Sequence, residues 1–298
     1  MSSRTFRARK VGVLFTAGVL AASAALAAVG SPASADSATP NSGVTTVAMR
    51  TAAPKPKDTA STRPTVVLVH GAWADGSSWY RVMDRLRKAG YPVIAEGNPL
   101  EGLAHDSATL QSRLRAINGP IILVGHSYGG AVITDAAAGN PNVKALVYIA
   151  AFAPDQGESV GSLLTVPVAH PIEQTPLLTY PVENADGTTD TATIIDPARF
   201  RDVFAGDLNP TLAADMADSQ RPTALSAVTE TVTEAAWHTI PSWYLVAKQD
   251  HAIAPDLERY MAKRLHAHTV ESDGSHSVMI SHPGAVTRLI QDADRGTR

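Results

Sequence analysis

Residues 121–132 read IILVGHSYGGAV and place one hydroxyl, that of Ser127, between glycines at the end of an apolar run. The apolar run indicates a buried strand, and the small residues that follow Tyr128 indicate a helix. Gly125–Gly129 matches Gly-x-Ser-x-Gly in a strand–turn–helix context, where glycines allow a sharp turn that exposes the serine hydroxyl. A turn that merely needs small residues is the alternative. The flanking elements favour a nucleophilic serine, because a helix N-terminus also favours negative charge at its hydroxyl.

Strand and helix patterns alternate on both sides of this segment. The expected strands are Thr65–His70, Tyr91–Ala95, 120–125, Val143–Ala151, Ser242–Ala247 and His268–Glu271. Amphipathic stretches between them predict helices, the last of them at about Pro283–Ala293. This alternation predicts an α/β fold, with a mostly parallel sheet flanked by helices on both faces.

The regular alternation stops at about residues 155–240. A hairpin that turns at Asp186-Gly187 and short helices broken by Pro210 are expected there. Because open parallel sheets bind ligands at the carboxyl ends of their strands, an insertion between two strands predicts a cap over that edge. Apolar residues of the cap suggest either an uncharged, modestly hydrophobic substrate or a small cap core: Leu163, Leu164, Leu177, Leu178 and Phe204.

The N-terminal residues have the pattern of a secretory signal. Four basic residues precede the uncharged stretch Val11–Gly30, and Ala33 and Ala35 form a small-x-small cleavage site. We expect cleavage after Ala35, a secreted (extracellular) protein, a flexible Ser/Thr/Ala/Pro-rich leader at 36–64, and one folded domain at 65–298. An uncleaved membrane anchor is the alternative reading of the long apolar stretch.

The net charge and the cysteine content exclude some classes of binding partner and of chemistry. Residues 1–35 carry four positive charges and no acidic ones, so their removal changes the formal net charge from -3 to -7. An acidic chain is a poor candidate for binding nucleic acid or anionic lipid, and we expect no stable membrane association after signal cleavage. The chain has no cysteine, so it has neither disulfides nor thiolate metal ligands.

A serine nucleophile needs a histidine base that a carboxylate orients. In this strand–turn–helix context the chain order is serine, acid, histidine. Asp250 directly follows the strand Ser242–Ala247, and His276 follows the strand His268–Glu271. Both are expected at the same sheet edge as Ser127, which makes Ser127, Asp250 and His276 the candidate catalytic residues.

Other residues compete for these roles. His251 adjoins Asp250 but is expected to point away from it, and His282 fits a helix cap or a surface position. Asp273 is an alternative acid, although it lies only three residues before His276. The pair His266 and His268 has metal-ligand spacing, yet no third ligand is evident, so no metal site is predicted.

Two backbone amides are expected to stabilise an oxyanion. One belongs to Tyr128, the residue after the serine, and the other to Ala72 in the loop that begins with His70-Gly71. A simple strand exit is the alternative reading of that loop. His70, Gly71 and Trp73 are the candidate substrate-pocket residues.

Four stretches resemble the α/β-hydrolase superfamily: HGAWADGSSW, GHSYGG, WYLVAKQDHAIAP and DGSHSVMISHP. They most resemble bacterial esterases akin to the plant methylesterase and hydroxynitrile lyase group, and the likeness runs from Thr65 to Ile290. The resemblance implies the α/β-hydrolase fold with a cap and carboxylic-ester hydrolysis without metal or organic cofactor. It also implies a triad at Ser127, Asp250 and His276. Ser277 stands where the lyase branch has a lysine, which speaks against lyase activity.

The sequence thus predicts a serine carboxylesterase that hydrolyses small to medium uncharged esters through an acyl-enzyme. Its expected partner is a small-molecule ester. A cofactor-free perhydrolase or haloperoxidase using the same triad is one alternative, and a non-catalytic ligand-binding protein on the same fold is the other. The sequence leaves open which ester is used and the oligomeric state.

Overall fold

The structure is a computed structural model that describes residues 63–183 and 187–298. The predicted signal peptide and the leader up to residue 62 lie outside the described residues, as does Asp186 of the predicted turn. Within the described residues, no helix is both long enough and apolar enough to cross a membrane.

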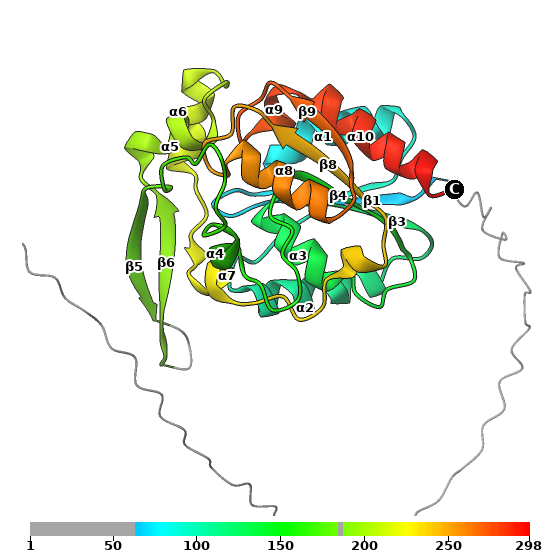
Figure 1. Cartoon of the computed structure of the whole chain (residues 1–298), viewed down its shortest axis with the longest axis horizontal. Helices are drawn as coiled ribbons and strands as arrows, with labels where there is room; N and C mark the ends of the chain where they lie inside the picture. Colours follow the sequence, from blue (N-terminus) through cyan, green and yellow to red (C-terminus); the bar gives the residue numbers. More distant parts are fainter. Residues whose placement is uncertain (1–62, 184–186) are drawn as a thin grey trace, which may run out of the picture. The chain divides into compact units, whose positions relative to one another are not determined.

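A six-stranded sheet forms the centre of the domain, with every neighbouring pair of strands parallel (Figure 1). The strand order is β2-β1-β3-β4-β8-β9. The strands are β1 Thr65–Val69, β2 Val93–Glu96, β3 Ile121–Ser127, β4 Val143–Ala151, β8 Ser242–Ala247 and β9 His268–Ser272. The predicted α/β-hydrolase fold, with its mostly parallel sheet, is confirmed.

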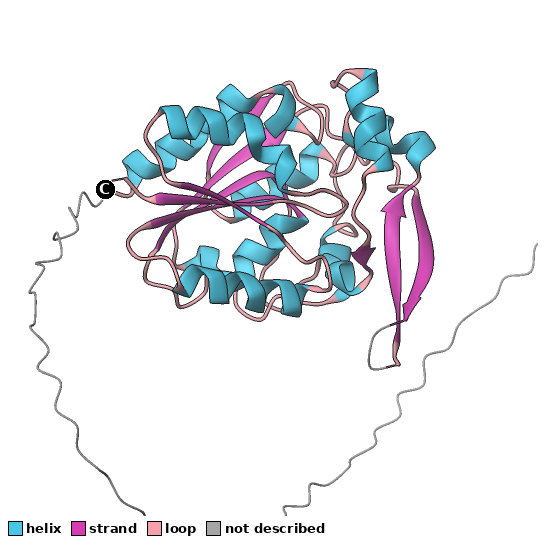
Figure 2. Cartoon of the chain, turned by 180° about the vertical axis from the view of Figure 1, so that it is seen from behind, coloured by secondary structure: helices cyan, strands magenta, loops and turns pink. Residues whose placement is uncertain are grey.

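Helices cover both faces of this sheet, as Figure 2 shows. On one face lie α2 Leu103–Arg115, α3 Tyr128–Ala136 and α8 Pro255–Arg264. On the other face lie α1 Tyr80–Lys88, α9 Val278–Ser281 and α10 Pro283–Gly296. The last helix runs three residues beyond the predicted end, and β2 begins at Val93 rather than Tyr91. The amide of Tyr91 instead bonds to the Leu86 carbonyl at the end of α1.

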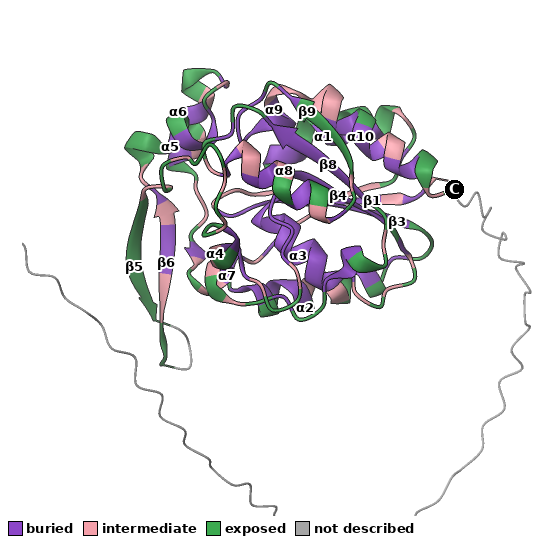
Figure 3. Cartoon of the chain, in the orientation of Figure 1, coloured by how far each residue is buried: buried purple, intermediate pink, exposed green. Residues whose placement is uncertain are grey.

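The two faces have separate hydrophobic cores, because successive strand residues point to opposite sides. In β3, Ile121 and Leu123 join the core under α2 and α3, whereas Ile122 and Val124 join the core under α1 and α10. All four side chains are fully buried, and Figure 3 shows the central strands β3, β4 and β8 as mainly buried, whereas the edge strand β9 is mostly exposed. Burying such a side chain contributes roughly 1.5–3 kcal/mol, so β3 holds both layers together.

Between β4 and β8 the chain forms a cap with its own small sheet. The predicted hairpin is confirmed: β5 Leu177–Glu183 pairs antiparallel with β6 Thr189–Ile195, and the short β7 Thr223–Ala224 adds to β6. The cap helices are α4 Val160–Leu163, α5 Pro197–Phe204, α6 Pro210–Asp218 and α7 Ser226–Thr229. Pro210 begins α6 rather than breaking a helix, since the first helical position needs no backbone N–H.

Candidate active site

Ser127 is the last residue of β3 and directly precedes α3. Its backbone has φ 53°, a left-handed conformation that non-glycine residues rarely adopt. The turn needs Gly125, because a Cβ there would lie 2.5 Å from the Gly129 carbonyl oxygen. The close approach of the strand end to the helix start therefore fixes this turn and places Ser127 at the N-terminus of α3.

Asp250 and His276 form a buried hydrogen-bonded pair, with His276 Nδ1 2.6 Å from Asp250 Oδ2. The second carboxylate oxygen accepts from the amides of Ala252 at 2.7 Å and Ile253 at 2.9 Å. Because Nδ1 donates to the carboxylate, the other ring nitrogen, Nε2, is the basic one. That Nε2 is buried and has no hydrogen-bond partner among the described residues.

His276 is held next to the serine turn by His126. His126 Nε2 donates to the His276 carbonyl at 2.9 Å, and the two ring centroids are 4.6 Å apart. Burial lowers the pKa of His126 well below its usual value, so this ring stays neutral and acts as a support. The structure therefore places the Asp250–His276 pair beside the turn that carries Ser127, at the carboxyl edge of the sheet, and no hydrogen bond joins Ser127 to His276 in the described residues.

The loop after β1 runs against the serine turn. A Cβ on Gly71 would lie 2.6 Å from Ser127 Cβ, so only glycine permits this approach. The next residue, Ala72, and Tyr128 make no backbone N–H hydrogen bond within residues 63–183 and 187–298. The two amides predicted to hold an oxyanion are thus both without a protein acceptor. The Tyr128 side chain points elsewhere, because its hydroxyl donates to Asp106 at 2.8 Å.

His70 is fully buried and braces this loop. Its Nδ1 contacts the Gly71 carbonyl at 2.9 Å, and its Nε2 accepts from the Asn98 amide at 3.1 Å. Burial, with a smaller contribution from the positive charge of Arg221, lowers the pKa of His70 to about 4. His70 is therefore neutral at neutral pH and anchors the loop that carries Ala72.

Trp73 joins the loop to the cap, a connection that the sequence did not indicate. Its backbone has φ 59°, its amide donates to the Thr223 hydroxyl at 3.0 Å, and its indole Nε1 donates to the Thr193 carbonyl at 3.1 Å. In addition, the Arg221 amide donates a hydrogen bond to the Trp73 carbonyl at 3.2 Å. Both threonines are buried. The cap sheet thus fixes the conformation of the residue that follows Ala72.

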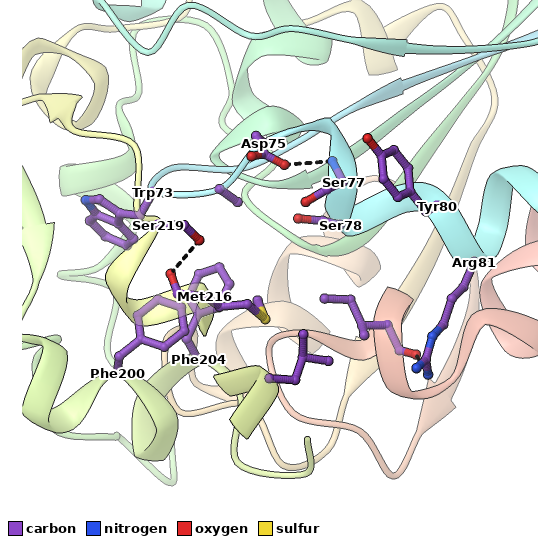
Figure 4. A pocket seen from close by; sticks show the side chains of 13 residues that line it. Trp73, Asp75, Ser77, Ser78, Tyr80, Arg81, Phe200, Phe204, Met216 and Ser219 are labelled. Atoms are coloured by element: carbon purple, nitrogen blue, oxygen red, sulfur yellow. Dashed lines mark hydrogen bonds between the residues drawn. The ribbon is translucent and has the colours of Figure 1, made fainter. Parts of the chain in front are cut away.

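A cavity of about 250 Å³ lies between the core and the cap (Figure 4). Its walls come from the loop after β1, the start of α1, the cap helices and α9, and they are mainly apolar. The apolar lining residues are Trp73, Ala74, Tyr80, Phe200, Phe204, Leu212, Met216 and Ile280. The polar lining residues are Asp75, Ser77, Ser78, Arg81 and Ser219. Of the three predicted pocket residues, only Trp73 lines this cavity. Ser127 and His276 are not among its lining residues.

Phe204 separates the cavity from the base. Its ring lies 4.7 Å from the His276 ring and stacks on Phe200 at 5.1 Å. Its carbonyl accepts from the Ser277 hydroxyl at 2.8 Å. Among the other apolar cap residues considered from the sequence, Leu163 is buried, whereas Leu164, Leu177 and Leu178 are exposed. The aromatic pair, rather than the leucines, is thus the part of the cap that faces the site.

The competing residues lie outside this arrangement. His251 is exposed and contacts the Asp202 carbonyl, and Asp273 forms an exposed salt bridge with Lys248 at 2.6 Å. The His282 ring is half-exposed and contacts the Ser281 hydroxyl at 2.9 Å. His268 stacks on Trp243 at the sheet edge. In the part of the chain that the structure describes, no group of three or more His, Asp or Glu side chains is arranged to hold a metal ion.

Family comparison agrees with the fold. The sequence profile of the alpha/beta hydrolase family matches residues 66–289. The chain therefore belongs to the alpha/beta hydrolase family, and the resemblance to plant methylesterases is confirmed by the relatives that it matches.

Two relatives and one solved structure illustrate the match. The carbendazim hydrolyzing esterase of Nocardioides sp. is 40% identical over 111 residues, 33% of this chain and less than half (46%) of that esterase. Methylesterase 8 of Arabidopsis thaliana is 26% identical over 213 residues, 65% of this chain and 75% of that protein. The crystal structure of polyneuridine aldehyde esterase superimposes with a TM-score of 0.63 at 18% identity, covering 77% of this chain and 98% of that one. At that identity the superposition bears on the fold alone.

Proposed function

We propose that the protein is a serine carboxylesterase that hydrolyses small to medium uncharged esters through an acyl-enzyme. The observation that carries the proposal is the buried Asp250–His276 hydrogen bond beside Ser127, with His276 Nε2 unpartnered. A basic nitrogen without a protein donor next to a serine on a strained turn is the arrangement that nucleophilic catalysis requires. The esterase relatives support the same reaction class.

In the proposed first step, His276 Nε2 takes the hydroxyl proton of Ser127 as its oxygen attacks the ester carbonyl. Asp250 stabilises the imidazolium that forms, and the amides of Ala72 and Tyr128 bind the oxyanion. His276 then donates the proton to the departing alcohol. In the second step, water deprotonated by His276 attacks the acyl-enzyme and releases the acid and free Ser127.

The cavity supports an uncharged substrate of modest size. Its volume of about 250 Å³ and its mainly apolar lining suit a short acyl chain or one aromatic ring. Ser277 occupies the position after the base, where the resembling lyases have a lysine, and donates to the Phe204 carbonyl. This position therefore supplies no cation beside His276, which favours ester hydrolysis over a lyase reaction.

The first experiment is hydrolysis of p-nitrophenyl esters from acetate to palmitate by the purified protein. Because the cavity that Phe200 and Phe204 line has a volume of only about 250 Å³, we expect turnover to peak at short acyl chains and to fall steeply with length. Bromination that depends on peroxide and acetate would assign the alternative perhydrolase or haloperoxidase activity. Saturable ligand binding without acid release, with no member of the series hydrolysed, would favour the binding protein and overturn the esterase proposal.

The cap should control the oxyanion loop through Thr223. Replacing Thr223 with valine removes the acceptor of the Trp73 amide at nearly constant volume, and we expect kcat for a short ester to fall about fivefold, because one hydrogen bond is worth roughly 1 kcal/mol. KM should change little. Thr223→Ser retains the hydroxyl and should stay close to wild type in a steady-state assay. Unchanged kcat in Thr223→Val, at a lowered melting temperature, would restrict Thr223 to a structural role.

We further propose that the mature protein acts outside the cell, on the basis of the signal pattern in residues 1–35. N-terminal sequencing of protein recovered from the culture medium tests this. Cleavage after Ala35 is the expected result, and retention of the protein in the membrane fraction would favour the uncleaved anchor.

A further inference from the structure

Glu258 is a fully buried acid that the proposed mechanism does not use. It lies on α8, eight residues after Asp250, and its carboxyl group interacts with the negatively charged carboxylate of Asp250. Its Oε2 accepts from the Ala247 amide, at the end of β8, at 3.1 Å. Burying an ionised carboxylate without a cation is very costly, so this carboxyl group needs a physical explanation.

The hydrogen bonds identify which of the two carboxyl groups carries a proton. Two carboxyl groups bond to each other only if one of them is protonated. Asp250 already accepts from His276, Ala252 and Ile253, which stabilises its charge. Glu258 accepts only from Ala247, and its Oε1 receives no hydrogen bond from a donor in the described residues. The proton therefore belongs on Glu258 Oε1.

The surrounding groups agree with a neutral Glu258. Burial raises its pKa well above the usual value, and the negative charge of Asp250 raises it further. Tyr244, which faces it from β8, is itself kept neutral, because burial raises the pKa of that phenol. The positive charge of Arg259 acts on Glu258, but its guanidinium pairs with Glu271 and Asp256. No positive charge in the described surroundings thus neutralises an ionised Glu258.

We propose that Glu258 is a protonated positioning residue that donates a hydrogen bond to Asp250 and thereby limits how strongly Asp250 stabilises the His276 imidazolium. This role rests on the proposed esterase function. A fourth hydrogen-bond donor reduces the negative charge on the Asp250 carboxylate, which then stabilises the His276 imidazolium less. His276 therefore loses its proton at a lower pH than it would without that donor. The acidic group behind the triad thus sets the lower pH limit of activity.

Two variants separate hydrogen-bond donation from packing. Glu258→Gln keeps a donor toward Asp250 and an acceptor for the Ala247 amide, so the acid limb of kcat/KM should stay where wild type has it. Glu258→Leu keeps the volume but removes the donor, so the imidazolium gains stability and the acid limb should move up by about one pH unit. An acid limb that moves equally in both variants would overturn the donor role.

Infrared spectroscopy at neutral pH tests the protonation directly and without substrate. Wild type should show the C=O stretch of a buried carboxylic acid, Glu258→Gln should lose that band, and the matched surface control Glu271→Gln should retain it. An unchanged carboxylic-acid region in Glu258→Gln would show that Glu258 is ionised and would overturn the proposal. The infrared test does not depend on ester hydrolysis, so it separates the role of Glu258 from the proposed esterase function. It can also be carried out if Glu258→Leu does not fold.

Discussion

Replacing Ser127 with alanine is expected to lower kcat for ester hydrolysis by on the order of 10⁶, because loss of a serine nucleophile removes the acyl-enzyme route. The fold should be unaffected. The Ser127 side chain makes no hydrogen bond within residues 63–183 and 187–298, and alanine places the same Cβ on the left-handed turn at φ 53°. The change therefore removes one oxygen atom and leaves the packing around Gly71 and Gly125 as it is.

The measurement is a comparison of purified wild type, Ser127→Ala and the control Ser107→Ala, with melting curves for all three. Ser107 is a buried serine on α2 that does not line the cavity, and its hydroxyl has no hydrogen-bond partner among the described residues. The control should keep wild-type turnover, and all three proteins should melt within a few degrees of each other. Hydrolysis that persists in folded Ser127→Ala would assign the nucleophile to another residue and overturn the proposed mechanism.

The fold could be predicted from the sequence because the patterns that identify its strands and helices each lie within a short segment of the chain. Continuous apolar runs such as Ile121–Val124 are typical of strands that are covered on both faces, and the alternating amphipathic stretches supply the covering helices. The serine turn is only partly local. Gly125 is needed for its close contact with Gly129, whereas Gly129 is needed for a contact with the end of β1, far along the chain. Asp250 and His276 could be placed at the same edge because parallel strands end together.

The links between the cap and the core could not be predicted, since they join residues far apart in the chain. Trp73 and Thr223 are separated by 150 positions, and a threonine in a polar, irregular stretch carries no signal for such a contact. The same holds for the cavity, whose walls come from residues 73–81, residues 200–219 and Ile280. His70 illustrates the opposite difficulty: its sequence position next to Gly71 suggested a pocket, whereas burial and the Asn98 amide make it a support for the loop.

The burial of Glu258 could not be predicted, because the helix pattern around it is an ordinary amphipathic one. In the stretch PDLERYMAKRLHA the predicted inward face contains Leu257 and Met261, and a glutamate between them is ordinarily solvated. The Asp250 loop folds over this turn of α8 and removes the carboxyl group from water, which no local pattern expresses.

Asp250→Asn is expected to lower kcat by on the order of 10⁴, by analogy with other triads. The structure gives a specific reason. The amides of Ala252 and Ile253 both donate to Oδ1, so the carbonyl oxygen of asparagine must stay there and its NH₂ group must face His276. An NH₂ group donates to Nδ1 and forces the proton onto Nε2. The imidazole then presents a donor to Ser127 and can no longer accept its proton.

Asp273→Asn is the matched control for this change. Asp273 is an exposed acid three residues before the base, and it pairs with Lys248 rather than with His276. An exposed pair of this kind contributes little, so activity should stay within about twofold of wild type. Kinetics of the two variants on one short ester therefore discriminate between the two carboxylates. If Asp273→Asn were the inactive protein, Asp273 would have to replace Asp250 as the acid, and the loop after β9 would need a different conformation during turnover.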